Sequence, residues 1–503
     1  MIAEYHEVER KYDIEPGRPL PPLVDDDPTL TLTEPVQTHL EAVYFDTPDF
    51  RLARHGATLR RRTGGEDQGW HLKLPAGEDG RDELRVPLDD AAESVPEPLV
   101  REVWALVRNK PLVPVAIVRT DRIERHLLDT DGRDLAVITD DTVHAEQLGE
   151  SATVTTWREV EVELVHGDPK LLDVLESRLE EGGLRRSAAT SKLARVLGDR
   201  IPGWARPRLK KKSAARTVVV RYLQEQVDEL VLRDRDARND APDAVHKMRV
   251  ATRRLRSALA TYRPLFDNQR TEPTRQELAW LGAALGKPRD AEVLRDRLRA
   301  HVSELPGELV LGPVTVRIDN EMNERHRAAH AELVQAMDSD RYLRLLDELD
   351  DLVVDPPFTD RAWRPAVREL PRHVARACRR VDRAATAAEQ AETPADHDVR
   401  LHDLRKAAKR ARYAAESVAP VFGKPAIRLA ARMEKLQQIL GEHQDSVVAR
   451  RVIRELAVAA TGENGFTFGL LYAQEADIAE SAQRTYRPAL RAAAKKRVRR
   501  WLR

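Results

Sequence analysis

The chain has 503 residues, which is too long for one ordinary hydrophobic core and predicts two or more domains. Its single cysteine, Cys378, excludes an intramolecular disulfide and fits a reducing compartment. Neither a signal peptide nor a run of about 18 apolar residues is found, so we expect a cytoplasmic protein that does not enter a membrane.

Charge is divided unevenly along a chain whose formal total is zero. Residues 1–200 contain 26 Lys+Arg and 41 Asp+Glu, a net charge of −15. Subtraction from the totals of 84 and 84 leaves 58 and 43 for residues 201–503, a net charge of +15. This division suggests two modules, the second with an anionic partner. Helical surfaces rich in Arg and Glu give similar counts, so charge alone leaves an ordinary solvated surface open.

Short segments that alternate apolar and polar residues fill the first part of the chain and predict about eight antiparallel strands. Turn signals such as Gly64-Gly65 and Asp131-Gly132 separate them. Residues 98–107 and 169–181 have helical spacing instead. The predicted strands are 7–12, 42–45, 58–62, 70–74, 82–86, 117–123, 135–139 and 158–164.

The first predicted strand carries two carboxylates and an ammonium group on one face. Glu7, Glu9 and Lys11 alternate with other residues, and alternate side chains of a strand point to the same side. On an exposed strand they would form a solvated face. Inside a closed barrel they would form a site for a metal ion and a phosphate.

Three later strands carry similar charged sets. Charges that face a barrel interior must pair or bind something, because burial of an isolated charge is costly. Carboxylates beside basic groups suit a divalent cation that holds a polyanion. The four strands together favour this site over solvated faces. The later sets are Arg60 and Arg62, then Lys73, then Glu159, Glu161 and Glu163.

Residues 2–200 resemble a CYTH domain of the triphosphate tunnel metalloenzymes. The resemblance extends from Glu7, Glu9 and Lys11 through Tyr44-Phe45-Asp46-Thr47, Leu59-Arg60-Arg61-Arg62, Leu72-Lys73 and Arg81-Asp82-Glu83 to the alternating glutamates and Ser191-Lys192-Leu193. It implies an eight-stranded antiparallel tunnel that binds a triphosphate with one or two divalent ions, Mg²⁺ or Mn²⁺.

The resemblance also implies residue roles in the tunnel. The implied metal ligands are Glu7, Glu9, Glu159 and Glu161. The implied substrate ligands are Lys11, Arg60, Arg62, Lys73, Lys192 and an arginine of the 119–122 segment, Arg119 or Arg122. Of these residues, Glu7, Glu9, Lys11, Arg119 and Arg122 would form the catalytic set.

One departure from the family pattern concerns water activation. Many hydrolytic members carry a lysine near an arginine on the strand that corresponds to 117–123, whereas this chain has Arg119 and Arg122 there and no lysine. Arginine is a poor general base because it stays protonated. Metal-assisted activation of water is then the remaining route to hydrolysis.

The sequence pattern changes near residue 200. Pro202, Gly203, Pro207 and the run Lys210-Lys211-Lys212 predict a linker over 201–213, between a first domain at 1–200 and a second at 214–503. After the linker, long segments rich in Ala, Leu, Arg and Glu have helical period.

The helical part contains an internal repeat. The segment His246–Arg256 matches His402–Arg412 at an offset of 156 (402 − 246). Leu285-Gly286 with Asp290 matches Leu440-Gly441 with Asp445 at an offset of 155 (440 − 285). We therefore expect two similar helical units, at about 214–375 and 376–503.

Each copy of the repeat places a histidine and three cations in a stripe beside the apolar face of its helix. Isolated basic helix faces are usually solvated, but the duplication favours an anion-binding surface. Asp290 and Asp445 are expected to orient the basic side chains rather than to bind metal. The stripes are His246, Arg249, Arg253 and Arg256 in the first copy, and His402, Arg405, Lys409 and Arg412 in the second. We call these eight residues the basic face.

The repeats resemble a CHAD domain, through H-x-x-R-x-x-x-[RK]-R-x-R and L-G-x-x-x-D, each present twice. The resemblance implies two pseudo-symmetric four-helix bundles whose basic face binds inorganic polyphosphate. A row of Arg and Lys matches the charge of such a chain without base recognition. Its histidines would add charge below about pH 6.5. Aromatic residues are only 5% of the chain, which argues against a specific nucleic-acid partner.

The expected fold class is therefore α+β, with an eight-stranded antiparallel β tunnel followed by an all-α domain of two bundles. The expected function is a metal-dependent triphosphatase or polyphosphatase that holds inorganic triphosphate or polyphosphate in its tunnel. Its helical domain would bind the polymer or dock the protein on polyphosphate granules. A non-catalytic polyphosphate-binding scaffold or sensor is the alternative, and cyclisation of ATP is a third reading, for which no adenine-binding motif is visible.

Overall fold

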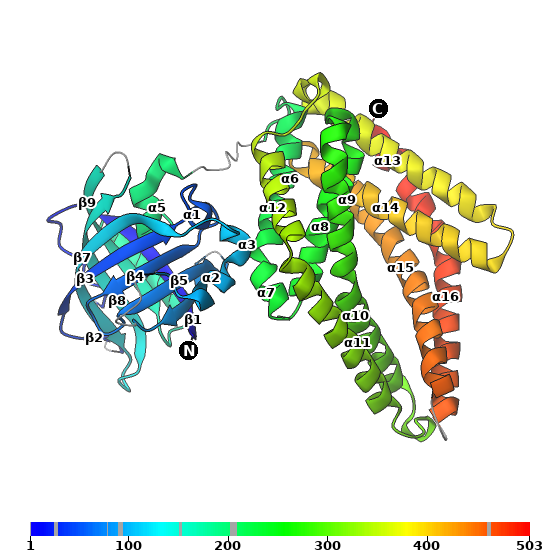
Figure 1. Ribbon diagram of the computed structural model, residues 1–503, viewed down its shortest axis with the longest axis horizontal. Helices are drawn as coiled ribbons and strands as arrows, with labels where there is room; N and C mark the ends of the chain where they lie inside the picture. The colour runs from blue at the N-terminus through cyan, green and yellow to red at the C-terminus, as the bar shows by residue number, and fades with distance from the viewer. Residues whose placement is uncertain are drawn as a thin grey trace. The chain divides into compact units, whose positions relative to one another are not determined.

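The computed structural model describes residues 2–24, 29–77, 79–88, 94–149, 153–201, 209–459 and 464–502. The chain divides into two compact units, Met1–Gly203 and Trp204–Arg503. The first is a β barrel, blue to cyan in Figure 1, and the second is a set of long helices, green to red. The predicted α+β class with two domains is confirmed.

The barrel is one antiparallel sheet that closes on itself. Around the ring the strands run β1-β6-β5-β4-β3-β7-β8-β9, and β9 pairs with β1 to complete eight strands. Closure leaves no unpaired edge in the ring. Two short strands, β2 (Thr31–Leu32) and β10 (Arg185–Arg186), pair with β7 and β1. The ring strands are β1 (Ala3–Ile14), β3 (Val36–Asp46), β4 (Thr58–Thr63), β5 (Gly69–Pro75), β6 (Gly80–Val86), β7 (Val113–Leu128), β8 (Asp134–Gln147) and β9 (Thr153–Leu164).

Two helices fix the inside and outside of the barrel. Helix α4 (Lys170–Glu181) buries Leu172, Leu175 and Leu179 against the outer, apolar side of β1, β8 and β9. Helix α5 (Lys192–Leu197) buries Leu193 and Leu197 in an apolar cluster on the inner side, near one end of the tunnel. The polar side of β1 and β9 therefore faces the lumen.

Three further short α-helices, α1 to α3, are found among the described residues of the first unit. Helix α1 (Arg51–Arg54) follows β3, and its amide groups are capped by Asp46, which accepts hydrogen bonds from the backbone nitrogens of Thr47, Leu52 and Ala53. The predicted helix 98–107 is instead two pieces, α2 (Glu97–Glu102) and α3 (Trp104–Val107), which separate at Val103.

The second unit is all helical, and α8 and α14 carry the two copies of the repeat. Helix α15 is continuous, whereas its counterpart in the first copy is divided into α9 and α10 at Leu285. The expected boundary between repeats, 375/376, falls inside α13, so the helices divide more naturally before Ala366. The helices are α6 (Ala215–Leu232), α7 (Asp234–Arg238), α8 (Ala244–Thr261), α9 (Asn268–Ala284), α10 (Gly286–Glu304), α11 (Val314–Met337), α12 (Asp340–Val354), α13 (Ala366–Glu389), α14 (Pro394–Phe422), α15 (Lys424–Ala459), α16 (Asn464–Ala494) and α17 (Lys496–Arg499).

The two bundles share apolar contacts at one end. Leu298 of α10 and Ile318 of α11 pack in one buried cluster with Val452 of α15 and Phe468 of α16. Within the described ranges, no helix is long and apolar enough to cross a bilayer.

Candidate functional site

The wall of the tunnel formed by β1 and β9 is strongly acidic. Glu7 and Glu9 are buried in the lumen, with 4% and 9% of their surface exposed. Because β1 pairs with β9, Glu9 lies opposite Glu163 and Lys11 lies opposite Glu161. Alternation on both strands thus places all of these side chains on one face.

Six carboxylates on this wall and the adjoining strand β8 form two groups of three. One group is Glu7, Glu9 and Glu163; within each group the ligand atoms lie within 4.8 Å of one another. Oxygen ligands at such spacing suit Mg²⁺ or Mn²⁺, so the residues fit a divalent cation. The second group is Asp141, Glu159 and Glu161. The four predicted metal ligands are therefore shared between two groups, which Glu163 and Asp141 complete.

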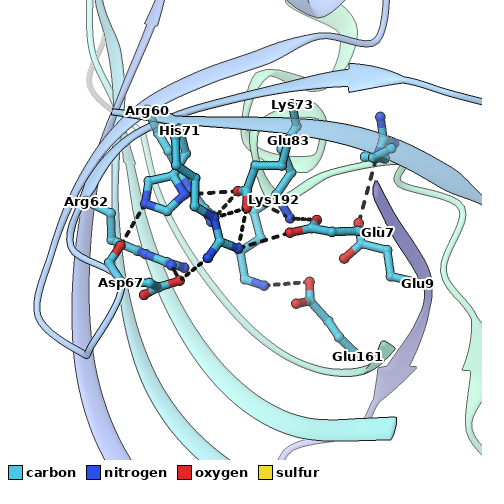
Figure 2. Close-up of polar contacts among 12 residues, drawn as sticks. Glu7, Glu9, Arg60, Arg62, Asp67, His71, Lys73, Glu83, Glu161 and Lys192 are labelled. Carbon is cyan, nitrogen blue, oxygen red and sulfur yellow. Dashed lines mark hydrogen bonds and ion pairs between the residues drawn. The ribbon is translucent and has the colours of Figure 1, made fainter. Parts of the chain in front are cut away.

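Cations hold the first group in place. The Lys73 ammonium contacts Glu7 (Figure 2). Arg85 Nη2 lies 3.2 Å from Glu7 Oε1. Burial raises the pKa of Glu7 to about 7 although Lys73 opposes the shift. For Glu9 the opposing cations prevail: burial alone would raise the pKa, but Lys11 and Lys73 hold it below its usual value.

A lysine ammonium sits in the middle of the second group. Lys192 Nζ lies 2.9 Å from Asp141, 2.8 Å from Glu159 and 2.7 Å from Glu161. It is placed there because Ser191 caps α5, accepting a hydrogen bond from the Ala194 amide. Burial would lower the pKa of Lys192, but the three carboxylates raise it well above its usual value. Lys192 therefore occupies this group as a tethered cation.

Basic side chains from β4, β5 and β7 complete the lumen. Arg122 donates two hydrogen bonds of 2.8 Å to Asp141, and Lys11 contacts Glu161. Arg60 donates to the Tyr44 hydroxyl at 3.4 Å, and Arg62 contacts Asp67. Burial, with Arg60 and Arg122 nearby, lowers the pKa of Arg62 to about 9. The structure thus brings Lys11, Arg60, Arg62, Lys73, Arg122 and Lys192 together with the carboxylates.

Arg119 does not join them. It is exposed and pairs with Glu41 on the outside of the barrel, with Nε and Oε2 at 2.7 Å. Arg119 and Arg122 are three residues apart on a regular part of β7, so alternation sends them to opposite faces. The prediction of a tunnel role for Arg119 is corrected, and Arg122 is the arginine of this strand that faces the site.

Sequence reasoning missed several tunnel residues. Glu83 is fully buried; it accepts a hydrogen bond of 2.9 Å from His71 Nδ1 and lies 3.8 Å from Lys73 (Figure 2). Alternation of Arg81, Glu83 and Arg85 on β6 was an available signal for it.

Asp141 was missed because it lies beyond the predicted strand 135–139. In the structure β8 continues to Gln147. Asp140 pairs outward with Arg158, and Asp141 pairs inward with Arg122 and Lys192. Because each charge has a partner on its own side, the strand tolerates both.

In the helical unit, the basic face is built on α8 and α14. Arg249 Nη1 lies 2.8 Å from Asp290, and Arg405 Nη1 lies 3.2 Å from Asp445. Both aspartates are thus oriented towards arginines of the face. Arg253 donates a hydrogen bond of 2.9 Å to the hydroxyl of Tyr413, which joins the two copies.

Cations crowd the middle of the face. Burial, together with Arg253, Arg405 and Arg249, lowers the pKa of Lys409 to about 7. Arg412 is partly neutralised by Glu416 at 2.6 Å and Glu434 at 2.9 Å. Arg256 is exposed, and no ion pair is found for it among the described residues. Excess positive charge is therefore concentrated around Lys409.

The two histidines of the basic face become protonated at a lower pH than expected. Burial and neighbouring cations, Arg289 for His246 and Lys406 for His402, lower both pKa values. They therefore gain charge only at a lower pH than the sequence-based expectation of about 6.5.

Family models and curated relatives agree with the two-unit structure. The model of the CYTH domain matches residues 5–196, and that of the CHAD domain matches residues 221–454. Two uncharacterized proteins of Mycobacterium tuberculosis, from strains CDC 1551 / Oshkosh and ATCC 25618 / H37Rv, are 41% identical over 508 residues, covering 97% of this chain and 96% of each relative.

Several solved structures are similar to part of this chain. PptA from Streptomyces chartreusis is 23% identical and covers 56% of this chain and 100% of its own, with a TM-score of 0.47. The CHAD domain from the plant Ricinus communis is 24% identical and covers 57% of this chain and 94% of its own, with a TM-score of 0.46. The putative adenylyl cyclase HpAC1 from Hippeastrum is described with a dominant triphosphatase activity. It is 16% identical and covers 38% of this chain and 93% of its own, with a TM-score of 0.21.

Both family matches follow the order of the two units, and the relatives align over nearly their whole length. The chain therefore belongs to the family of proteins in which a CYTH domain is followed by a CHAD domain.

Proposed function

We propose that the tunnel binds inorganic triphosphate or a polyphosphate end together with Mg²⁺ or Mn²⁺, and that it hydrolyses a phosphoanhydride bond. The observation that carries this proposal is the pair of three-carboxylate groups facing lumenal Arg and Lys side chains in a closed barrel. The lumenal charges of both signs match a metal-bound polyanion.

In this proposal the carboxylates bind metal ions and the basic side chains bind phosphate. Glu7, Glu9 and Glu163 would hold one cation, and Asp141, Glu159 and Glu161 a second. Arg60, Arg62, Lys73 and Arg122 would bind phosphate oxygens, where each charge-assisted contact contributes about 1.5–3 kcal/mol. When bound, the metal supplies charge neutralisation and Lewis acidity.

Lys11 and Lys192 have a double role in this proposal. In the structure their ammonium groups neutralise the second carboxylate group. With a cation held by Asp141, Glu159 and Glu161, the Lys192 ammonium would be available to bind a phosphate oxygen. Arg122 stays protonated and so orients phosphate rather than accepting a proton from water.

The test is an assay of phosphate release from triphosphate, long polyphosphate and ATP, each with Mg²⁺ or Mn²⁺ and with a chelator. Metal-dependent release from the inorganic substrates is the expected result. Tight binding without release would instead favour the scaffold or sensor function, which the missing lysine of β7 supports. Release of pyrophosphate from ATP with a cyclic product would favour cyclisation.

For the helical unit we propose binding of long polyphosphate across both copies of the repeat, either to retain the polymer or to place the protein on polyphosphate granules. The contact between Arg253 and Tyr413 supports a continuous surface. A chain that spans both stripes gains because its second contact is intramolecular. Charge reversal in either copy should therefore weaken the binding of long polyphosphate far more than the binding of triphosphate. The two double variants are Arg249→Glu with Arg253→Glu and Arg405→Glu with Lys409→Glu.

Salt and competition measurements complete that test. Affinity should fall steeply with salt because counterions are released on binding. The proposal would be contradicted if duplex DNA competed for the basic face as well as polyphosphate of equal charge does. It would also be contradicted if charge reversal in one repeat left the affinity unchanged. Either result would indicate a general basic surface.

A further inference from the structure

A second basic site lies in the helical unit, away from the basic face. A cavity of about 420 Å³ lies among α8, α9, α13 and α14. Four arginines line it, Arg263, Arg275, Arg380 and Arg410, with Glu272 as the single carboxylate, so the lining carries a net charge of +3 (four minus one). Arg410 follows Lys409 in sequence, but adjacent helical residues point about 100° apart, and none of the eight basic-face residues lines this cavity.

Two of the four arginines have a hydrogen-bond partner in the lining, and the other two have none. Arg275 Nε donates to Glu272 at 2.9 Å, and Arg263 Nε donates to Asn268 at 2.9 Å. Arg380 and Arg410 have no hydrogen-bond or ion-pair partner among the described residues. Uncompensated guanidinium groups around one cavity repel each other, and an anion between them relieves that repulsion.

The internal repeat supplies a matched comparison. A smaller cavity of about 220 Å³ contains Arg254, which the offset of 156 makes the counterpart of Arg410 (410 − 156 = 254). The same offset pairs Glu416 of the smaller cavity with Ala260 of the larger one (416 − 156 = 260).

This difference accounts for one of the three charges by which the two linings differ. In the smaller cavity Arg254 lies 3.3 Å from Glu416, and Arg221 lies 3.2 Å from Glu225. Its two arginines and two glutamates give a net charge of zero. In the larger cavity Ala260 leaves Arg410 without the equivalent carboxylate. One cavity is therefore neutral and the other has a net charge of +3, to which the missing carboxylate at position 260 contributes one unit.

We propose that the larger cavity is a binding site for a compact inorganic oligophosphate, of the size of pyrophosphate or triphosphate. Planar guanidinium groups match phosphate oxygens in pairs, and the net charge of the lining matches an anion with about three or four negative charges. No aromatic side chain lines the cavity, so it lacks a surface for stacking a nucleobase. This site goes beyond the proposed function, since neither the tunnel nor the basic face contributes to it.

The test is calorimetric titration of the full chain with pyrophosphate in metal-free buffer that contains EDTA. Ala260→Glu restores the carboxylate of the smaller cavity and should remove one pyrophosphate site or weaken it at least tenfold, with long-polyphosphate affinity within twofold of wild type. Arg380→Ala should weaken the same site several-fold. Ala473→Glu, an equal charge change at an exposed position of α16, is the control and should leave both ligands unaffected.

Three results would overturn the site. Unchanged pyrophosphate binding by Ala260→Glu would show that the cavity is not used. An equal loss with Ala473→Glu would reduce the effect to general electrostatics. An equal loss of long-polyphosphate affinity would make the cavity part of the basic face rather than a separate site. Thermal unfolding of each variant confirms that the comparison is between folded proteins.

Discussion

The guanidinium group of Arg249 lies against the backbone of Gly286, where an added Cβ would come 3.2 Å from Nη2. Asp290, one turn further along α10, contacts Nη1 of the same arginine at 2.8 Å. The second copy repeats this arrangement with Arg405, Gly441 and Asp445. There the added Cβ would also lie 3.2 Å from Nη2, and Asp445 lies 3.2 Å from Nη1. The motif L-G-x-x-x-D therefore forms a socket that positions one arginine of the basic face in each repeat.

Replacing the glycine should disturb the arginine without harming the helix. Gly286→Ala should weaken long-polyphosphate binding about fivefold, because partial loss of one charge-assisted contact is worth about 1 kcal/mol. Stability should stay the same or rise, since alanine is favoured over glycine in helices by about 0.5–1 kcal/mol. Titration and thermal unfolding together measure both effects.

Gly282→Ala is the matched control, because its Cβ would meet Thr252 Cγ2 at an ordinary 3.6 Å. It should leave binding unchanged. Equal binding by the two variants would mean that Arg249 moves aside without cost and that the socket has no positioning role.

Polyphosphate binding should depend on pH through Lys409. Burial among Arg249, Arg253 and Arg405, which Asp445 only partly offsets, lowers its pKa to about 7, so it is largely neutral in the free protein above that pH. A bound polyanion favours the ammonium form and raises the pKa, so binding takes up one proton. Affinity should fall by up to about tenfold per pH unit as the pH rises above 7.

Lys409→Arg provides the control for this titration, since arginine keeps its charge throughout the range. Its affinity should be flat between pH 7 and 9. If the wild type is equally flat, another group sets the charge of the face. A wild-type rise confined to pH values below 6 would assign the dependence to His246 and His402 instead.

Metal dependence should reside in the carboxylates of the tunnel wall. Glu9→Gln removes one carboxylate charge from the group formed by Glu7, Glu9 and Glu163. This change should abolish metal-assisted triphosphate binding or turnover. Glu41→Gln, which changes a carboxylate on the outside of the barrel, should behave as wild type. Metal titrations followed by calorimetry with triphosphate distinguish them, and unchanged metal dependence in Glu9→Gln would refute the assignment.

Two arginines of β7 allow the inside of the barrel to be compared with its outside. Arg122→Ala should weaken triphosphate binding by about 1.5–3 kcal/mol, roughly 10- to 150-fold, because its fork faces the lumen. It should also lower the melting temperature, since Asp141 loses a buried partner. Arg119→Ala should change neither quantity, because that side chain is exposed. Equal losses of affinity in the two variants would place the binding site outside the lumen.

Local patterns in the sequence were enough to identify much of the site. The two-residue period of a strand put Glu7, Glu9 and Lys11 on one face, and the helical period put Arg249, Arg253 and their repeats in one stripe. The duplication of L-G-x-x-x-D indicated that Asp290 and Asp445 act on neighbouring basic side chains. These features depend on residues close together in sequence, so they do not depend on how the helices and strands pack together.

Tertiary structure decided which groups meet. Alternation along a strand assigns side chains to two faces but does not say which face is lumenal. Only closure of the barrel distinguished the lumenal Arg122 from the exposed Arg119. Pairing of β1 with β9 placed Glu163 beside Glu7 and Glu9, and α5 carried Lys192 into the carboxylates of β8 and β9. Packing of α8, α9, α13 and α14 gathered four arginines around one cavity. Such contacts join residues distant in sequence, and their geometry is set by the packing of whole elements rather than by any local period.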